Sequence, residues 1–152
     1  VILEYDPVNA EYYNKNAYDY DNKIKNLDTK IKDLVSTSKR KEIIFAGKFP
    51  LHYFVKEYGL EYKAGYDYCN IENDITQEKI FELEKEIKDN SIPVIYTVEL
   101  TSFKNVNAIS KDTGAKVLMF QSFHNISKAF NNDASYVSLM DRNIEILKEG
   151  LN

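Results

Sequence analysis

The sequence predicts an α/β fold: a four-stranded parallel sheet with helices on both faces, preceded by one long helix. Four short apolar runs carry most of this prediction, at 43–46, 60–64, 93–98 and 115–120. Each is followed by apolar residues at helical spacing. Near-continuous apolar strands are typical of parallel sheets, because the crossover helices cover both faces.

Length, charge and cysteine content narrow the class of protein. The 152 residues suit one domain or one lobe of a larger protein, with a sizeable core. A net charge of −4, with the lysines dispersed among acids, argues against a nucleic-acid partner. The sequence shows neither a membrane-spanning apolar run nor a signal peptide. Its single cysteine, Cys69, cannot form an internal disulfide.

The first 37 residues predict one long amphipathic helix, with Asp6 as N-cap and Pro7 as its first residue. Apolar and aromatic side chains recur along it at three- and four-residue spacing: Val8, Tyr12, Ala17, Tyr20, Ile24, Leu27, Ile31 and Leu34. At 1.5 Å per residue it would be roughly 45 Å long, more than a compact lobe needs. We therefore expect its start to belong to another body, and its tyrosines to form an interface with the lobes.

Four further helices are predicted from caps and periodicity. The first lies at about 49–58 and ends at Gly59. The second begins after Asp74, the expected N-cap, which would form a capping box with Gln77. The third is short and ends before Gly114, and the fourth lies at 135–151. Ligands of parallel sheets bind beyond the carboxyl ends of the strands. Those tips are expected at 46–48, which we expect to be exposed, and at 66–72, 99–102 and 121–125. None has the glycine spacing that cradles phosphates, so nucleotide binding is not expected.

Several short motifs occur in a family-specific order. They are Asp6-Pro7-x-Asn9-Ala10-x-Tyr12-Tyr13-x-x-Asn16-Ala17, Phe49-Pro50, Tyr58-Gly59-Leu60, Glu99, Thr113-Gly114-Ala115-Lys116 and the run from Tyr136 to Asn143. In this order they resemble the C-terminal half of the solute-binding proteins of zinc and manganese ABC transporters, of the ZnuA/TroA type. A closer branch reads Gly-Asp-Arg-Phe-Pro-Phe at 46–51 and Gly-Cys-Ser-Ala-Glu-Thr-Glu at 68–74. The resemblance covers essentially the whole chain.

The resemblance implies two α/β lobes joined by one long helix, with the metal held between the lobes. Residues 1–37 would be the end of the connecting helix and 38–152 the C-terminal lobe, without the N-terminal lobe. The expected partners are that lobe and an ABC permease in the membrane, and the full-length protein would be extracytoplasmic and lipid-anchored. Zinc or manganese would be cargo, bound poorly by this chain alone, and no cofactor is expected. Exposed Val8, Tyr12 and Tyr13 would favour self-association.

Both ligand positions that the resemblance assigns to this lobe are altered. Ala46 stands where the family has His or Glu, and Gly47 where the closer branch has aspartate. Gln121 stands where the family has Asp or His, and an amide oxygen is a weak ligand for zinc or manganese. Glu99 still matches the family's acidic residue.

Other side chains on the same sheet edge could substitute as metal ligands. His124, Glu72 and Cys69, together with Glu99, would supply imidazole, carboxylate and thiolate. The alternatives are that His124 lies on a solvated loop, that Glu72 interacts with a helix N-terminus and that Cys69 packs beside the sheet. His52 is expected to be a packed or surface histidine.

Three classes of function follow. The first is a binding protein for a divalent transition metal, zinc or manganese. The second is a descendant of the same fold that binds another solute or a protein partner, as the losses at Ala46 and Gln121 would favour. The third, an enzyme with Cys69 as nucleophile and His124 as base, is disfavoured, because no basic niche at a helix N-terminus would activate the thiol. The sequence therefore predicts no enzyme.

Overall fold

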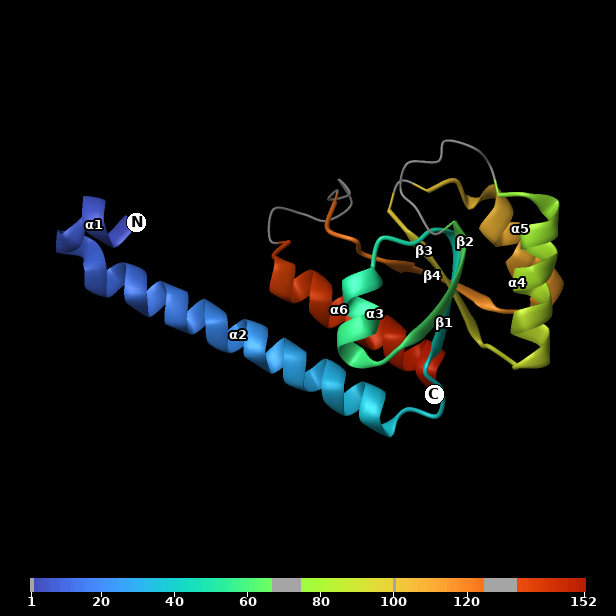
Figure 1. Ribbon diagram of the computed structural model, residues 1–152, viewed down its shortest axis with the longest axis horizontal. Coiled ribbons are helices and arrows are strands. Elements are labelled where there is room, and N and C mark those ends of the chain that lie inside the picture. The colour runs from blue at the N-terminus through green and yellow to red at the C-terminus, as the bar shows by residue number, and fades with distance from the viewer. Residues whose placement is uncertain (1, 67–74, 100, 125–133) are drawn as a thin grey trace.

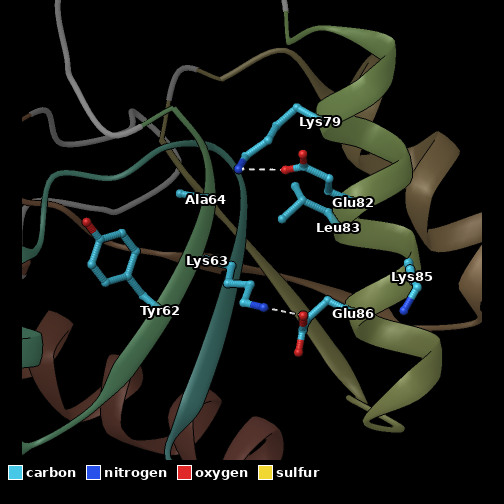
Figure 2. A pocket seen from close by; sticks show the side chains of 8 residues that line it. All are labelled: Tyr62, Lys63, Ala64, Lys79, Glu82, Leu83, Lys85 and Glu86. Atoms are coloured by element: carbon cyan, nitrogen blue, oxygen red, sulfur yellow. Dashed lines mark hydrogen bonds and ion pairs between the residues drawn. The ribbon is translucent and has the colours of Figure 1, made fainter.

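A computed structural model of the chain describes residues 2–66, 75–99, 101–124 and 134–152 (Figure 1). The elements are α1 (Ile2–Tyr5), the 3-10 helix η1 (Pro7–Asn9), α2 (Ala10–Thr37), β1 (Glu42–Lys48), α3 (His52–Tyr58), β2 (Glu61–Tyr66), α4 (Gln77–Asp89), β3 (Val94–Val98), α5 (Phe103–Thr113), β4 (Lys116–Phe120) and α6 (Tyr136–Leu151). The predicted fold class, with its long N-terminal helix, is confirmed. Within these described residues, no helix is both long and apolar enough to cross a bilayer.

The four strands form one parallel sheet in the order β2-β1-β3-β4. Phe45 of β1 lies opposite Ala64 of β2 and Tyr96 of β3, and Val98 of β3 lies opposite Phe120 of β4. The chain leaves β1 toward one edge of the sheet and then returns past it to β3. The carboxyl ends of β1 and β3 therefore flank the point where the strand order reverses, which is where ligands bind in open α/β sheets.

Helices cover both faces of the sheet, so the core has two halves. On one face, Phe45, Tyr96 and Phe120 pack with apolar residues of α2, α3 and α6. On the other, Ile44 and Ile95 pack with apolar residues of α4 and α5. Figure 1 shows the two groups of helices on opposite sides of the strands. Alternate residues of β1 and β3 thus enter different halves, as the near-continuous apolar strands predicted.

Only the C-terminal half of α2 packs on the lobe. Leu27, Ile31 and Val35 are buried there. Asp28 accepts a hydrogen bond from the Tyr58 hydroxyl of α3 at 3.1 Å. Burial, with this bond to the Asp28 carboxylate, raises the pKa of Tyr58 to about 12. Lys30 forms an ion pair of 2.6 Å with Asp141 of α6.

The N-terminal half of α2 extends away from the sheet (Figure 1). Val8 is 91% exposed, and Tyr12, Tyr18 and Tyr20 are exposed as well. These side chains do not pack on the lobe, so a contact with another body stays a prediction. Of the predicted interface residues, Tyr13 is half-buried, and its hydroxyl donates to Asp6 at 2.8 Å.

The long helix begins at the predicted residues, with Asp6 in the N-cap position and Pro7 as the first residue, but the conformation of its first turn differs from the prediction. Asp6 precedes a 3-10 turn instead of an α-helix, and its carboxylate makes no cap bond to the backbone. It accepts instead from the Asn9 amide at 2.9 Å and from Tyr13, and these bonds lower its pKa. The short helix α1 was not predicted.

Two other helix starts differ as well. Helix α3 begins at His52 because the Phe49 N–H still donates to the Tyr66 carbonyl, at 3.2 Å, in continuation of the sheet. The N-cap of α4 is Thr76, whose hydroxyl accepts from the Lys79 N–H at 3.3 Å. The predicted capping box of Asp74 with Gln77 is therefore wrong, and Asp74 itself lies outside the described residues.

The predicted helix ends at glycine are confirmed. Gly59 closes α3 with φ 65° and Gly114 closes α5 with φ 80°. Both values lie in the left-handed region, where a residue with a Cβ is strained.

Candidate functional site

Two predicted site residues lie at the carboxyl ends of neighbouring strands. Glu99 follows β3 and Gln121 follows β4, directly after the paired residues Val98 and Phe120. Both are buried, at 6% and 4% exposure. The parallel register of β3 and β4 therefore brings a carboxylate and a carboxamide together at one edge of the sheet.

Ser122 holds the Glu99 carboxylate. The Ser122 N–H donates to Oε2 at 2.9 Å and the Ser122 hydroxyl donates to Oε1 at 2.7 Å. Hydrogen bonds to an ionised group are stronger than neutral ones, so this pair fixes the orientation of the carboxylate. A carboxylate is also one of the ligand types that zinc binds in proteins.

The backbone of Gln121 is held by a side chain of α6. The Gln121 N–H donates to Oδ1 of Asn143 at 2.8 Å, and Nδ2 of Asn143 donates to the Gln121 carbonyl at 3.0 Å. The side-chain oxygen of Gln121 is buried without a hydrogen-bond partner among the described residues, as is the Thr97 hydroxyl, two residues before Glu99. A buried acceptor without a partner costs free energy, so Oε1 of Gln121 has capacity for a ligand.

His124 lies three residues after Gln121, at the end of the short turn that follows β4. Its side chain is exposed, and its N–H donates to the Ser122 hydroxyl at 3.4 Å. Phe123 adopts φ 65°, an uncommon conformation for a residue with a side chain. The Phe123 ring packs on Tyr136 of α6, with centroids 4.6 Å apart. We refer to residues 121–124 as the β4 turn; it carries His124 three residues after the buried Gln121.

The first-strand position differs from the expectation. Strand β1 continues to Lys48, so 46–48 are strand residues and not an exposed tip. Ala46 is 5% exposed and belongs to the same apolar cluster as Ile75 and Val106. A Cβ on Gly47 would come within 3.3 Å of Thr101 in the segment after β3. The place of the family's first ligand is therefore apolar and covered.

The structure brings Glu99, Gln121 and His124 to one sheet edge, while Glu72 and Cys69 lie outside the described residues. Across the described residues, no three His, Cys, Asp or Glu side chains come close enough together to hold a metal ion. His52 packs against Phe49, with ring centroids 5.2 Å apart, and against the Tyr62 hydroxyl, as expected of a structural histidine.

Sequence reasoning did not identify Ser122 and Asn143 as site residues. The signal for Asn143 was present, because it is a polar residue on the apolar face of α6 beside Met140 and Ile144. Ser122 offered no comparable pattern.

The fold and the site define a class: an α/β lobe that is preceded by a long helix and has buried polar side chains at the carboxyl ends of its strands. Residues 2–150 match the family model described as zinc-uptake complex component A, periplasmic (ZnuA). The chain therefore belongs to this family, which is one of transport binding proteins and not of enzymes.

Two curated relatives support this membership. The chain is 27% identical over 153 residues to the high-affinity zinc uptake system protein ZnuA of Bacillus subtilis (strain 168), covering 99% of this chain and 47% of the relative. It is 26% identical over 152 residues to the manganese ABC transporter substrate-binding lipoprotein PsaA of Streptococcus pneumoniae, covering 99% of this chain and 49% of the relative. The chain thus spans about half the length of these relatives, consistent with the predicted single lobe.

Solved structures show the same fold. The metal-dependent lipoprotein YcdH of Bacillus subtilis superimposes with a TM-score of 0.82 at 28% identity, covering 99% of this chain and 57% of that one. The Zn(II)-bound ZnuA-like domain of AdcA from Streptococcus pneumoniae gives 0.77 at 24% identity, with 99% and 56% covered. The laminin-binding protein Lbp of Streptococcus pyogenes gives 0.73 at 20% identity, with 99% and 56% covered. The last two show the fold alone.

Proposed function

We propose that this chain is the C-terminal lobe of an extracytoplasmic solute-binding protein that delivers zinc or manganese to an ABC permease. Residues 1–37 are the end of the helix that joins this lobe to an N-terminal lobe, and 38–152 form the lobe itself. The relatives, about twice as long, include one named as a lipoprotein and one as a zinc uptake protein, which supports a lipid-anchored receptor outside the cytoplasm.

The observation that carries the proposal is the pair of buried polar groups at the ends of β3 and β4. Glu99 is an oriented carboxylate, and Gln121 has an acceptor oxygen without a partner among the described residues. His124 follows on the same turn and supplies an imidazole, the side chain that zinc favours most beside thiolate. Glu72, which follows β2 in the sequence and lies outside the described residues, is proposed as a further carboxylate.

Binding to this chain alone is expected to be weak. Gln121 is a poor ligand, Ala46 supplies none, and further ligands are proposed to come from the N-terminal lobe. The site fits a transition metal as cargo shared between two lobes and not as a resident cofactor of one.

A second candidate is favoured by the burial of Ala46. Ala46 supplies no ligand atom and lies within an apolar cluster, so the first-strand position contributes nothing to a metal site. The same fold would then bind another solute or a protein partner at this edge, without metal.

The two histidines offer a direct experiment with an internal control. In NMR spectra of the imidazole nitrogens, zinc chloride in the millimolar range is expected to shift the His124 signals and leave those of His52 in place. Magnesium chloride is the matched salt control, because magnesium takes oxygen ligands and retains its waters.

Three outcomes are informative. A shift of His124 that is lost in Glu99→Gln places the metal at the proposed site. Equal shifts of His52 and His124 would indicate unspecific binding to imidazole. No shift at either histidine would remove the metal site and leave the second candidate.

A further inference from the structure

We propose that Asn143 is the positioning residue of this site: its carboxamide fixes the backbone of Gln121 and thereby the β4 turn, which carries Gln121, His124 and the Ser122 that binds Glu99. The effect of Asn143 on metal binding rests on the proposed function. The fixing of the turn itself is independent of any ligand.

Asn143 is fully buried, at 0% exposure, on a helix whose other buried residues are apolar or glycine. Burying a carboxamide in such a layer is costly unless its groups are hydrogen-bonded. Here both ends are used, at 2.8 Å and 3.0 Å, on the N–H and the carbonyl of one residue. The side chain thus pairs with the first residue beyond β4 as a neighbouring strand would.

The rest of the turn depends on this anchor through a chain of contacts. Ser122, the next residue, makes both hydrogen bonds to Glu99, and its hydroxyl accepts from the His124 N–H. Between them, Phe123 has φ 65° and is held against Tyr136 of α6. An uncommon backbone conformation persists only where its surroundings fix it, and here α6 supplies both fixed points, Asn143 and Tyr136.

Asn143 touches none of the proposed ligand atoms, so its loss should act through Gln121 and Ser122. In Asn143→Leu, the Gln121 N–H and carbonyl lose their partners and the turn should open locally. We expect the amide hydrogen exchange of Gln121 and Ser122 to accelerate at least tenfold relative to that of Phe45, in the centre of β1.

Leu147→Ala is the matched control. Leu147 is also fully buried on α6 but has an apolar side chain, so its truncation destabilises the lobe without removing a hydrogen bond from the turn. All slow amides, including Phe45, Gln121 and Ser122, should then accelerate in step. Zinc affinity, read from the His124 signals, should weaken about 10- to 100-fold in Asn143→Leu, the range found when residues that orient metal ligands are removed. In Leu147→Ala it should stay within about threefold.

The wild-type protein gives a test that needs no variant. If Asn143 anchors the turn, the Gln121 amide should exchange as slowly as those of β3, although it lies beyond the end of β4. Fast exchange of Gln121, or exchange of Ser122 in step with Phe45 in Asn143→Leu, would overturn the proposal. If zinc affects neither histidine while the exchange pattern holds, the metal function fails and the positioning role of Asn143 stands.

Discussion

Replacing Phe45 by alanine is expected to lower the free energy of unfolding by about 3–5 kcal/mol, the range for removing a buried aromatic ring. Phe45 is fully buried at the centre of β1. Its ring centroid lies 5.4 Å from that of Tyr96, 5.2 Å from Phe49 and 6.1 Å from Phe120. Each of these contacts joins β1 to another part of the sheet or to the segment leading into α3.

Urea denaturation followed by circular dichroism measures this effect, and Phe81→Ala is the control. Phe81 is 63% exposed on α4, so its removal should change stability by no more than about 0.5 kcal/mol. A loss below about 1 kcal/mol for Phe45→Ala would show that the aromatic cluster is not the centre of the core.

Replacing Gln121 by histidine is expected to strengthen zinc binding by at least about tenfold, equivalent to about 1.4 kcal/mol. Imidazole is a much better zinc ligand than an amide oxygen. Residue 121 is already buried, directly after β4 as Glu99 is after β3. Asn143 holds its backbone, so the backbone that carries the new imidazole is already fixed. Isothermal titration calorimetry with zinc chloride compares the two proteins.

Gln121→Leu is the matched variant with the opposite expectation. It removes a buried acceptor that has no partner among the described residues, so the metal-free protein should gain stability, by about 1 kcal/mol. Zinc binding should weaken at the same time. If Gln121→His and Gln121→Leu bind zinc equally well, residue 121 does not face the metal.

Much of the fold was predictable because its signals are local or periodic. Near-continuous apolar runs predicted buried parallel strands. Gly59 and Gly114 predicted helix ends because glycine adopts a left-handed φ without strain, and both residues do so in the structure. The order of the strands was not predicted, because it depends on which helix crosses which face. The start of α3 was placed too early, because Phe49 still belongs to the hydrogen bonding of the sheet.

The site was predicted in part. Glu99 and Gln121 could be placed at one edge because parallel strands end together, whereas the burial of Ala46 depends on Ile75 and on helices far away in sequence. The roles of Ser122 and Asn143 arise from contacts between residues 22 or 23 positions apart in the sequence. Asn143 carried a local signal as a polar residue on the apolar face of α6, whereas Ser122 carried none.

Zinc titration of the wild-type chain and of Glu99→Gln determines whether Glu99 is a metal ligand at the ends of β3 and β4. Glutamine keeps the shape and can still accept from the Ser122 N–H, so the turn should survive while the charge is lost. We expect weak zinc binding by the wild type that falls by more than about tenfold in the variant, because removing a ligand should cost more affinity than removing a residue that only orients one. Equal affinity of the two proteins, or no zinc binding by either, would contradict this role of Glu99.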